Sequence, residues 1–249
     1  MRMLWPEAID EVSDADLERL YGYPEQPGKP WVQVNFVSSA DGAATVEDKS
    51  EGLSHPADKR IFLLGRDLAD VVLVGAGTAR AEQYRGARVN EERRARRARL
   101  GLSPVPPIAV VSGSARIEPD CPLFTDTEVP PIIVTTEHAP AERRAKLSDA
   151  GADIVIAGEQ MVELPIALAE LDRRGLRRVN CEGGPHLFGE LIAEDLVDQL
   201  CLTIAPVLAG AGANRIAMGR NASQGERLDL ASLLLEDDFT MFRYRKRGS

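Results

Sequence analysis

The stretch from Asp70 to Glu82 has the residue types of an anion-binding turn. Its first part, 70–74, is mostly valine and leucine, which predicts a strand buried on both faces. Gly75 and Gly77 then turn the chain, and Thr78 is placed to cap a helix. A strand that leads through a glycine turn into a helix presents free backbone N–H groups and a partial positive charge. The stretch therefore predicts a site for a phosphate or pyrophosphate group.

The spacing of these residues differs from the Rossmann dinucleotide fingerprint in two ways. That fingerprint has a Gly or Ala three residues after the second glycine, where this chain has Arg80. It also has an acidic residue at the end of the next strand, about 20 residues on. This chain has the charged run 91–97 there, which predicts a helix. The phosphate site stands, but a Rossmann fold is not predicted.

A second strand and glycine turn occurs later in the chain. The run 178–181 predicts a strand, the turn 182–185 follows it, and a helix is predicted over 187–193. The turn contains Glu182, Gly183 and Gly184. This helix offers a second N-terminus that could bind an anion. Glu182 stands at the carboxyl end of the strand and adds a carboxylate to the same region.

The elements that must position these turns alternate along the chain. Further strands are predicted over 31–37, 108–111, 131–134, 154–156, 199–205 and 239–245, and helices over 54–68, 141–150 and 164–174. Ser13 and Asp16 predict a capping box that opens a short helix. The alternation predicts an α/β fold with a mostly parallel sheet, helices on both faces and an antiparallel last strand at or near an edge. Residues 1–29 are expected to form an N-terminal helix and lead-in, and 30–249 a single domain.

Composition limits the class of protein. The 249 residues carry a formal net charge of −9, which argues against a nucleic-acid-binding surface. There is no apolar run of membrane-spanning length and no signal-peptide pattern, so a cytoplasmic protein is expected. The three cysteines and three histidines lack metal-ligand spacing, so free thiols and no metal site are expected.

Two charged segments have alternative interpretations. The arginine-rich run 84–102 is typical of a solvated helix, although Arg85 or Arg88 could reach an anionic substrate. The polar segment 47–52 is either a mobile flap beside the site or an ordinary solvated loop.

Taken in order, several of these segments resemble the riboflavin-pathway pyrimidine reductases, the reductase half of bifunctional riboflavin proteins, which share the dihydrofolate reductase fold. The resemblance covers roughly residues 30 to 245. The segments that carry it are Asn35-Phe36-Val37-Ser38-Ser39-Ala40-Asp41-Gly42, Asp70-Val71-Val72-Leu73-Val74-Gly75-Ala76-Gly77-Thr78, Glu182-Gly183-Gly184-Pro185, Leu196-Val197-Asp198 and Ala205-Pro206-Val207-Leu208-Ala209-Gly210.

The resemblance implies a homodimeric reductase that uses NADPH to reduce 5-amino-6-(5-phosphoribosylamino)uracil. By position, it implies a cofactor site at Val37, Gly75, Gly77, Thr78, Glu82, Ser112, Gly183, Gly184 and Leu187. It implies substrate contacts at Asn35, Ser50, Arg66 and Glu182. Ser112, Ser114 or Arg116 would bind the cofactor's 2′-phosphate. Asp41 and Asp67 are the candidate proton shuttles, although Asp41 could equally cap its own turn.

The chain departs from the family pattern in three respects. It has neither the His-x-Glu nor the Pro-Cys-x-x-Cys motif of a deaminase. It has Asn35, as in the archaeal-type reductases, where bacterial bifunctional relatives often have lysine. After Glu82 the family usually continues to an arginine that grips the ribose phosphate, and here Arg85 and Arg88 are the two candidates to replace it.

The missing phosphate-gripping pattern leaves two other functions open. One is a pterin reductase on the same fold, which requires a buried carboxylate to anchor the ring's amino group and N3. Asp67 or Glu182 could provide that carboxylate. The other is a non-catalytic nucleotide-binding protein.

Overall fold

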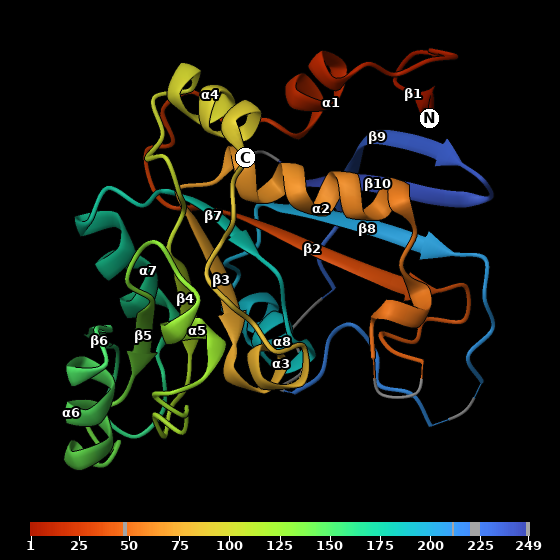
Figure 1. The fold of residues 1–249 in the computed structure, drawn as a ribbon. Coiled ribbons are helices and arrows are strands. Elements are labelled where there is room, and N and C mark those ends of the chain that lie inside the picture. The colour runs from red at the N-terminus through yellow and green to blue at the C-terminus, as the bar shows by residue number, and fades with distance from the viewer. Residues whose placement is uncertain (47–48, 211, 220–224, 248–249) are drawn as a thin grey trace.

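The computed structural model describes residues 1–46, 49–210, 212–219 and 225–247. Within these residues the strands form one ten-stranded sheet in the order β1-β9-β10-β8-β2-β7-β3-β4-β5-β6 (Figure 1). The strands are β1 (Arg2–Trp5), β2 (Trp31–Ser39), β3 (Val71–Gly75), β4 (Ile108–Val111), β5 (Ile132–Thr135), β6 (Asp153–Ile156), β7 (Arg178–Cys181), β8 (Gln199–Ala205), β9 (Leu228–Glu236) and β10 (Phe239–Lys246). The α-helices are α1 (Asp14–Tyr21), α2 (Pro56–Leu68), α3 (Ala76–Ala81), α4 (Glu91–Arg99), α5 (Pro122–Thr125), α6 (Ala141–Asp149), α7 (Leu164–Arg173) and α8 (Pro185–Ala193).

The predicted mixed α/β architecture is confirmed. Strands β8, β2, β7, β3, β4, β5 and β6 are mutually parallel, whereas β10 pairs antiparallel with β8. The last strand is not at the edge, because β9 and then β1 continue the sheet beyond it. Neither β9 nor β1 was predicted. The edge strand β1 brings residues 2–5 into the same sheet, and α1 packs with α2 in one apolar cluster.

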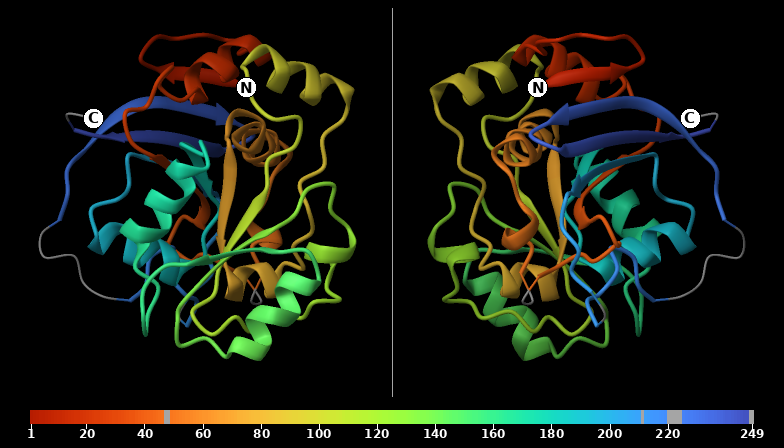
Figure 2. Two further views of the ribbon diagram at one scale, coloured as in Figure 1. Left: turned by 90° about the vertical axis from the view of Figure 1, so that its left-hand side faces the viewer. Right: turned by 90° about the vertical axis from the view of Figure 1, so that its right-hand side faces the viewer.

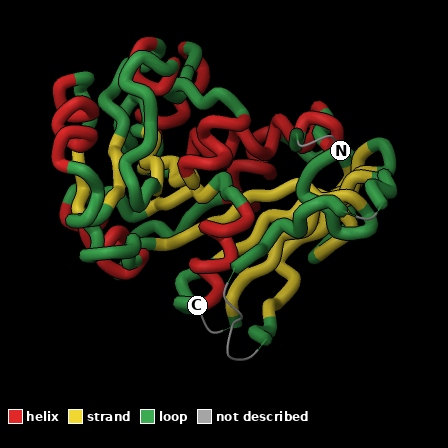
Figure 3. Tube along the Cα trace, turned by 90° about the horizontal axis from the view of Figure 1, so that it is seen from below, coloured by secondary structure: helices red, strands yellow, loops and turns green. Residues whose placement is uncertain are grey.

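Helices cover both faces of the sheet, as Figures 2 and 3 show from three sides. The helices α7 and α8 pack on one face against a cluster that includes Val34, Leu73 and Cys181. The alternate residues of the same strands, such as Val72 and Val74, point to the opposite face, where α5 and α6 cover them. The helix α2 lies on this second face, between that cluster and the antiparallel strands.

The position of α2 over β7 depends on one glycine. A Cβ atom added at Gly65 would lie 3.0 Å from the side-chain oxygen of Asn180 on β7. The helix therefore approaches the strand at a distance that a larger residue would disturb. Pro56 at the first turn and the side chain of His55, which accepts a hydrogen bond from the N–H of Ala57, fix where the helix begins.

The arginine-rich helix α4 is not the fully solvated helix that its composition suggests. Arg97 is 0% exposed and donates hydrogen bonds to the backbone carbonyl oxygens of Arg66 and Ala69 at 2.8 Å each. These carbonyl groups lie at the C-terminal end of α2, where the helix itself offers no partner. Arg93 and Arg96 also turn inward, toward Asp67. The helix α4 thus holds the end of α2 in place.

Three further predictions concern membrane spans, the cysteines and the segment 47–52. No helix among the described residues has the length and apolar character needed to cross a membrane. Cys181 and Cys201 are buried, Cys121 is half-buried, and all three are free thiols, as predicted. The segment 47–52, predicted as a flap or a solvated loop, lies partly outside the described residues.

Candidate active site

Two cavities open where the carboxyl ends of β2, β3 and β7 meet. The first, of about 610 Å³, lies between α2 and these strand ends, and we name it the α2 cavity. The second, of about 880 Å³, runs along the N-terminal ends of α3 and α8, and we name it the α8 groove. Thr78, Gly184 and Pro185 line both. The two cavities therefore adjoin at the two predicted glycine turns.

The α8 groove collects most of the predicted cofactor residues. Gly75, Gly77, Thr78, Ser112, Gly184 and Leu187 all line it. The helix α3 begins at Ala76 with Gly75 as its N-cap, so the prediction that Thr78 caps this helix is wrong. Thr78 lies inside the first turn instead, because the chain becomes helical immediately after the strand. Ser114, Arg80 and Arg116 also line the groove and give it cationic and hydroxyl groups.

The turn between β7 and α8 can be built only from residues without side chains. Gly183 has a φ of +90°, and a Cβ atom there would lie 2.8 Å from the ring of Phe36. A Cβ atom at Gly184 would collide with the hydroxyl oxygen of Thr78. The peptide between the two glycines is cis. Gly184 is also the N-cap of α8, so the backbone N–H groups of this helix face the groove without a side chain in front of them.

The α2 cavity collects the predicted substrate residues. Asn35, Ser50, Arg66 and Glu182 line it, together with the predicted cofactor residues Val37 and Glu82. Glu82 accepts a hydrogen bond from the Ser50 hydroxyl at 2.9 Å, so these two residues join the segment before α2 to the end of α3. Thr78 is shared with the groove.

Arg66 and Glu182 form a two-pronged ion pair in the wall of the α2 cavity. The Nε and Nη2 atoms of Arg66 donate to the two oxygens of Glu182, at 2.7 Å each. The Tyr84 hydroxyl donates to Glu182 at 2.7 Å and the Asn180 amide at 3.1 Å. Burial lowers the pKa of Arg66, but Glu182 and Tyr84 outweigh it and hold that pKa above its usual value. Burial also raises the pKa of Tyr84, so its hydroxyl stays a donor.

Asp58 is a cavity residue that the sequence interpretation missed. Its position in the first turn of α2 gave it a purely structural meaning as part of a helix-start signal. The side chain is buried, lines the α2 cavity, and accepts a hydrogen bond from the Ser54 hydroxyl at 3.5 Å. Burial raises the pKa of this carboxyl above its ordinary value, although Thr203, Ser54, His55 and Lys59 act in the opposite direction.

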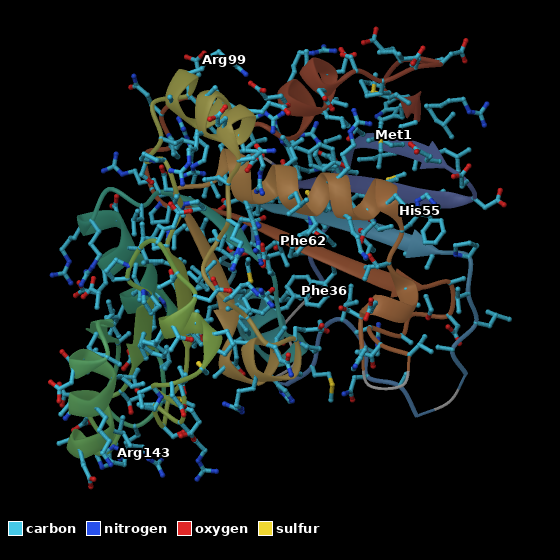
Figure 4. All side chains as sticks on the ribbon, in the orientation of Figure 1. Met1, Phe36, His55, Phe62, Arg99 and Arg143 are labelled. Carbon is cyan, nitrogen blue, oxygen red and sulfur yellow. The ribbon has the colours of Figure 1, made fainter. Side chains whose placement is uncertain are left out.

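Two aromatic rings complete the cavity. Phe62 lies one helical turn after Asp58 on α2, and Phe36 lies on β2. Figure 4 labels both rings, which lie near the middle of the molecule below α2 in that view. The guanidinium of Arg66 is stacked over the Phe62 ring at 4.8 Å from its centre. The cavity thus has flat apolar surfaces as well as charged groups.

The two carboxylates predicted as proton shuttles, Asp41 and Asp67, lie outside the described lining of both cavities. Asp41 accepts hydrogen bonds from the Ser39 hydroxyl and from the N–H groups of Ala209 and Gly210, which lower its pKa to about 2. The bond from Ser39 is local to the turn of Asp41, whereas Ala209 and Gly210 belong to another loop. Asp67 points away from the cavity because it is adjacent to Arg66 on a helix, and adjacent helical residues face in different directions.

Of the two arginines predicted to reach an anionic substrate, Arg85 lines the α2 cavity and Arg88 does not belong to its described lining. Both form ion pairs with Asp126. Lys59 also lines the α2 cavity, one residue after Asp58. Arg85 and Lys59 therefore provide cationic groups in the lining of the α2 cavity.

Known proteins resemble this chain in sequence and in fold. The family model described as RibD C-terminal domain matches residues 30–237. A protein of Archaeoglobus fulgidus named 2,5-diamino-6-ribosylamino-4(3H)-pyrimidinone 5′-phosphate reductase is 31% identical over 183 residues, 73% of this chain and 83% of that protein. A protein of the same name from Methanothermobacter thermautotrophicus is 31% identical over 216 residues, 86% of this chain and 94% of that protein. The crystal structure of a pyrimidine reductase-like protein from Corynebacterium diphtheriae superposes with a TM-score of 0.80 at 26% identity, over 94% of this chain and 99% of that one.

Proposed function

Because this chain belongs to the RibD C-terminal domain family, we propose that it is an NADPH-dependent reductase of riboflavin biosynthesis whose substrate is a ribosylaminopyrimidinone 5′-phosphate. The observation that carries the proposal is the junction of the two cavities at Thr78 and Gly184. A cofactor in one cavity and a pyrimidine in the other would meet there. The substrate is either the predicted 5-amino-6-(5-phosphoribosylamino)uracil or its 2-amino counterpart, which the names of the two archaeal relatives specify.

The α8 groove fits a dinucleotide. Its backbone is bare where Gly183 and Gly184 exclude any Cβ atom, and two helix N-termini face it. Arg80, Arg116 and the hydroxyls of Ser112 and Ser114 would hold the phosphate groups on the adenosine side. When bound, NADPH would supply the hydride. Preference for NADPH over NADH rests on these cationic groups.

In the α2 cavity the chain binds and orients the substrate. The hydride acceptor is the ribose C1′ carbon in the open, imine form of the substrate, so orientation relative to the junction is the main task of the protein. The Arg66–Glu182 pair forms a fixed wall, and Lys59 and Arg85 would attract the 5′-phosphate. The rings of Phe36 and Phe62 would exclude water from the base.

A pterin reductase finds no support in the two carboxylates suggested for it. Asp67 lies outside the described lining of the cavity. Glu182 already accepts hydrogen bonds from Arg66, Tyr84 and Asn180. We keep the pyrimidine as the proposed substrate because the named relatives are pyrimidinone 5′-phosphate reductases.

We also propose that the chain acts as a homodimer. The face of β8, β10 and β9 opposite α1 and α2 is largely apolar. Half-buried on it are Leu200, Leu202, Ile204, Leu233, Leu235, Phe242 and Tyr244, with Thr240 among them. Neighbouring residues of this row are paired across the strands, as in Leu202 with Phe242 and Phe242 with Leu233. A largely apolar sheet face of this kind is typical of a surface that a second copy covers.

The test of the proposed activity is oxidation of NADPH by the purified protein. We expect turnover with a ribosylaminopyrimidinone 5′-phosphate, much slower turnover with NADH, and none with dihydrofolate. Absence of turnover with both pyrimidine phosphates would overturn the proposal. Tight NADPH binding without turnover on any of these compounds would support a non-catalytic nucleotide-binding protein.

A further inference from the structure

The two buried carboxylates in the described lining of the α2 cavity, Glu182 and Asp58, differ in how many of their hydrogen-bond acceptor positions are occupied. An ionised carboxylate can accept about four hydrogen bonds. Glu182 receives four, two of them from Arg66 and one each from Tyr84 and Asn180. It also has the cation that balances its charge. Glu182 therefore has no acceptor position left for a ligand.

Asp58 is buried to a similar degree but lacks such partners. It is 8% exposed, and among the described residues its side chain accepts one hydrogen bond, from the Ser54 hydroxyl at 3.5 Å. No ion pair involves Asp58 among the described residues. Most of its acceptor positions therefore remain open, on a residue that lines the cavity. A buried carboxylate in this condition gains most from a ligand that brings N–H groups.

The surroundings of Asp58 favour a flat ligand. Asp58, Phe62 and Arg66 are spaced four residues apart on α2, so they follow one another along a single face of the helix, and all three line the cavity. A planar ring placed against Phe62 would have one edge toward Asp58. Arg66, at the other end of this row, is engaged by Glu182. The edge facing Asp58 is therefore the one that the chain can recognise with an open hydrogen-bonding group.

We propose that Asp58 is the residue that determines ring specificity, by accepting hydrogen bonds from the N3–H and 2-amino groups of a 2-amino-4-oxopyrimidine. This inference rests on the proposed function, because it concerns the same cavity and the same reaction. A carboxylate matches two parallel N–H groups. A uracil ring presents N3–H beside a 2-oxo group, whose lone pairs would face the second carboxylate oxygen. The chain would then select the 2-amino substrate over the uracil.

The same N–H pair occurs in pterins, so dihydrofolate is a second possible source of this edge. The two ligands differ in that the pyrimidine carries a ribose phosphate and dihydrofolate does not. Lys59 and Arg85 line the same cavity and favour the ligand with the phosphate. We commit to the phosphorylated pyrimidine and include dihydrofolate as an arm of the test.

The decisive variant is Asp58→Asn, which keeps the shape of the side chain but offers one acceptor and one donor. The amide oxygen can accept from N3–H of uracil while its NH₂ group donates to the 2-oxo group. We expect the ratio of kcat/KM for the 2-amino substrate to that for the uracil substrate to fall by about 100-fold or more. Asp153→Asn makes the same chemical change on the partly exposed strand β6 and should leave the ratio unchanged.

A second measurement separates binding from turnover. Calorimetric titration of each pyrimidine phosphate into the cofactor-free protein should show the same reversal of preference in Asp58→Asn. An unchanged ratio in both measurements, with a folded variant, would overturn the role of Asp58 while leaving the proposed function in place. Failure of the wild-type protein to reduce either pyrimidine would overturn the proposed function itself. Turnover with dihydrofolate that Asp58→Asn abolishes would reassign the substrate to a pterin and overturn the commitment to the pyrimidine.

Discussion

At the scale of single residues, the site depends on how charge is compensated inside the α2 cavity. Arg66 and Glu182 come from helix and strand segments far apart in the chain and meet as a closed pair. The sequence supplied both residues, through the family resemblance, as substrate contacts. It could not supply their pairing, because that depends on how α2 lies over β7.

The closed pair predicts a large effect of neutralising one partner. Glu182→Gln leaves the buried guanidinium of Arg66 without its counter-charge, and we expect a loss of about 3 kcal/mol in the free energy of unfolding. Urea denaturation would measure it. The matched variant Tyr84→Phe removes only one of the hydrogen bonds to Glu182 and should cost about 1 kcal/mol. Equal effects of the two variants would contradict the view that charge compensation dominates here.

Asp58 predicts that part of the folding stability is lost as pH rises, whereas a carboxylate in an ion pair adds stability as pH rises. Its pKa is raised in the folded protein, chiefly by burial, so the folded state disfavours its charged form. This cost is absent below the ordinary value of 3.8, where the group is protonated in both states, and appears as pH rises through the folded pKa. Asp58→Asn should therefore raise the melting temperature at pH 7.

The gain should shrink toward zero as pH falls below about 4. Thermal melts of wild type and variant across this range would measure it. The charges of His55 and Lys59 act to lower the pKa of Asp58, and both residues are kept in the variant. A gain that stays constant with pH would show that the effect arises from packing rather than from the charge.

The missed and misplaced residues show which information the sequence lacked. Asp58 was missed because an acidic residue in the first turn of a helix has a sufficient local explanation. Asp67 is the predicted proton shuttle next to Arg66 in sequence, but a step of one residue turns a helical side chain by about 100°. Only the tertiary placement of α2 distinguishes the two aspartates.

At the scale of elements, the predicted strands and helices were mostly found because buried parallel strands have continuous apolar runs. The strands β3, β4 and β5 follow this rule. The strand β9 has leucines whose spacing is compatible with a helix as well as with a strand, and β1 has only four residues. Their pairing with each other across most of the chain is what makes them strands. That information is not local.

The contact between α4 and the end of α2 predicts a structural effect on the site. Arg97→Met removes donors from the carbonyl oxygens of Arg66, Ala69 and Ser103. We expect a loss of about 3 kcal/mol or more in the free energy of unfolding, because buried carbonyl groups lose their partners. Hydrogen exchange should also become faster in the last turn of α2, and KM for the pyrimidine should rise since Arg66 lies in that turn.

The control for this prediction is Arg94→Met on the same helix. Arg94 is partly exposed and pairs with Glu128, so its replacement should change stability by less than about 1 kcal/mol. If both variants lost equal stability, helix composition rather than the anchoring of α2 would be responsible.

At the scale of the whole molecule, the sheet has two functionally different parts. The parallel part is covered by helices on both faces, and its carboxyl ends form the α2 cavity and the α8 groove. On the antiparallel part, α1 and α2 cover one face. Its other face contains Leu200, Leu202, Ile204, Leu233, Leu235, Phe242 and Tyr244, all half-buried. The sequence predicted an antiparallel last strand, but the extent of this apolar face follows from the three-strand extension.

This face predicts that one charge on it will prevent self-association. Leu202 lies on β8, paired with Phe242, whose ring is stacked with that of Tyr244 at 5.7 Å. Leu202→Asp would bury a carboxylate against these rings in a dimer but would leave it accessible to water in a monomer. We expect sedimentation equilibrium to give about twice the 27.1 kDa chain mass for the wild type and the single-chain mass for the variant. Ile166→Asp, an equally apolar-to-charged change on the exposed side of α7, should remain dimeric. A wild-type protein that sediments as a monomer, or a dimeric Leu202→Asp variant, would contradict the assignment of this face to a second copy.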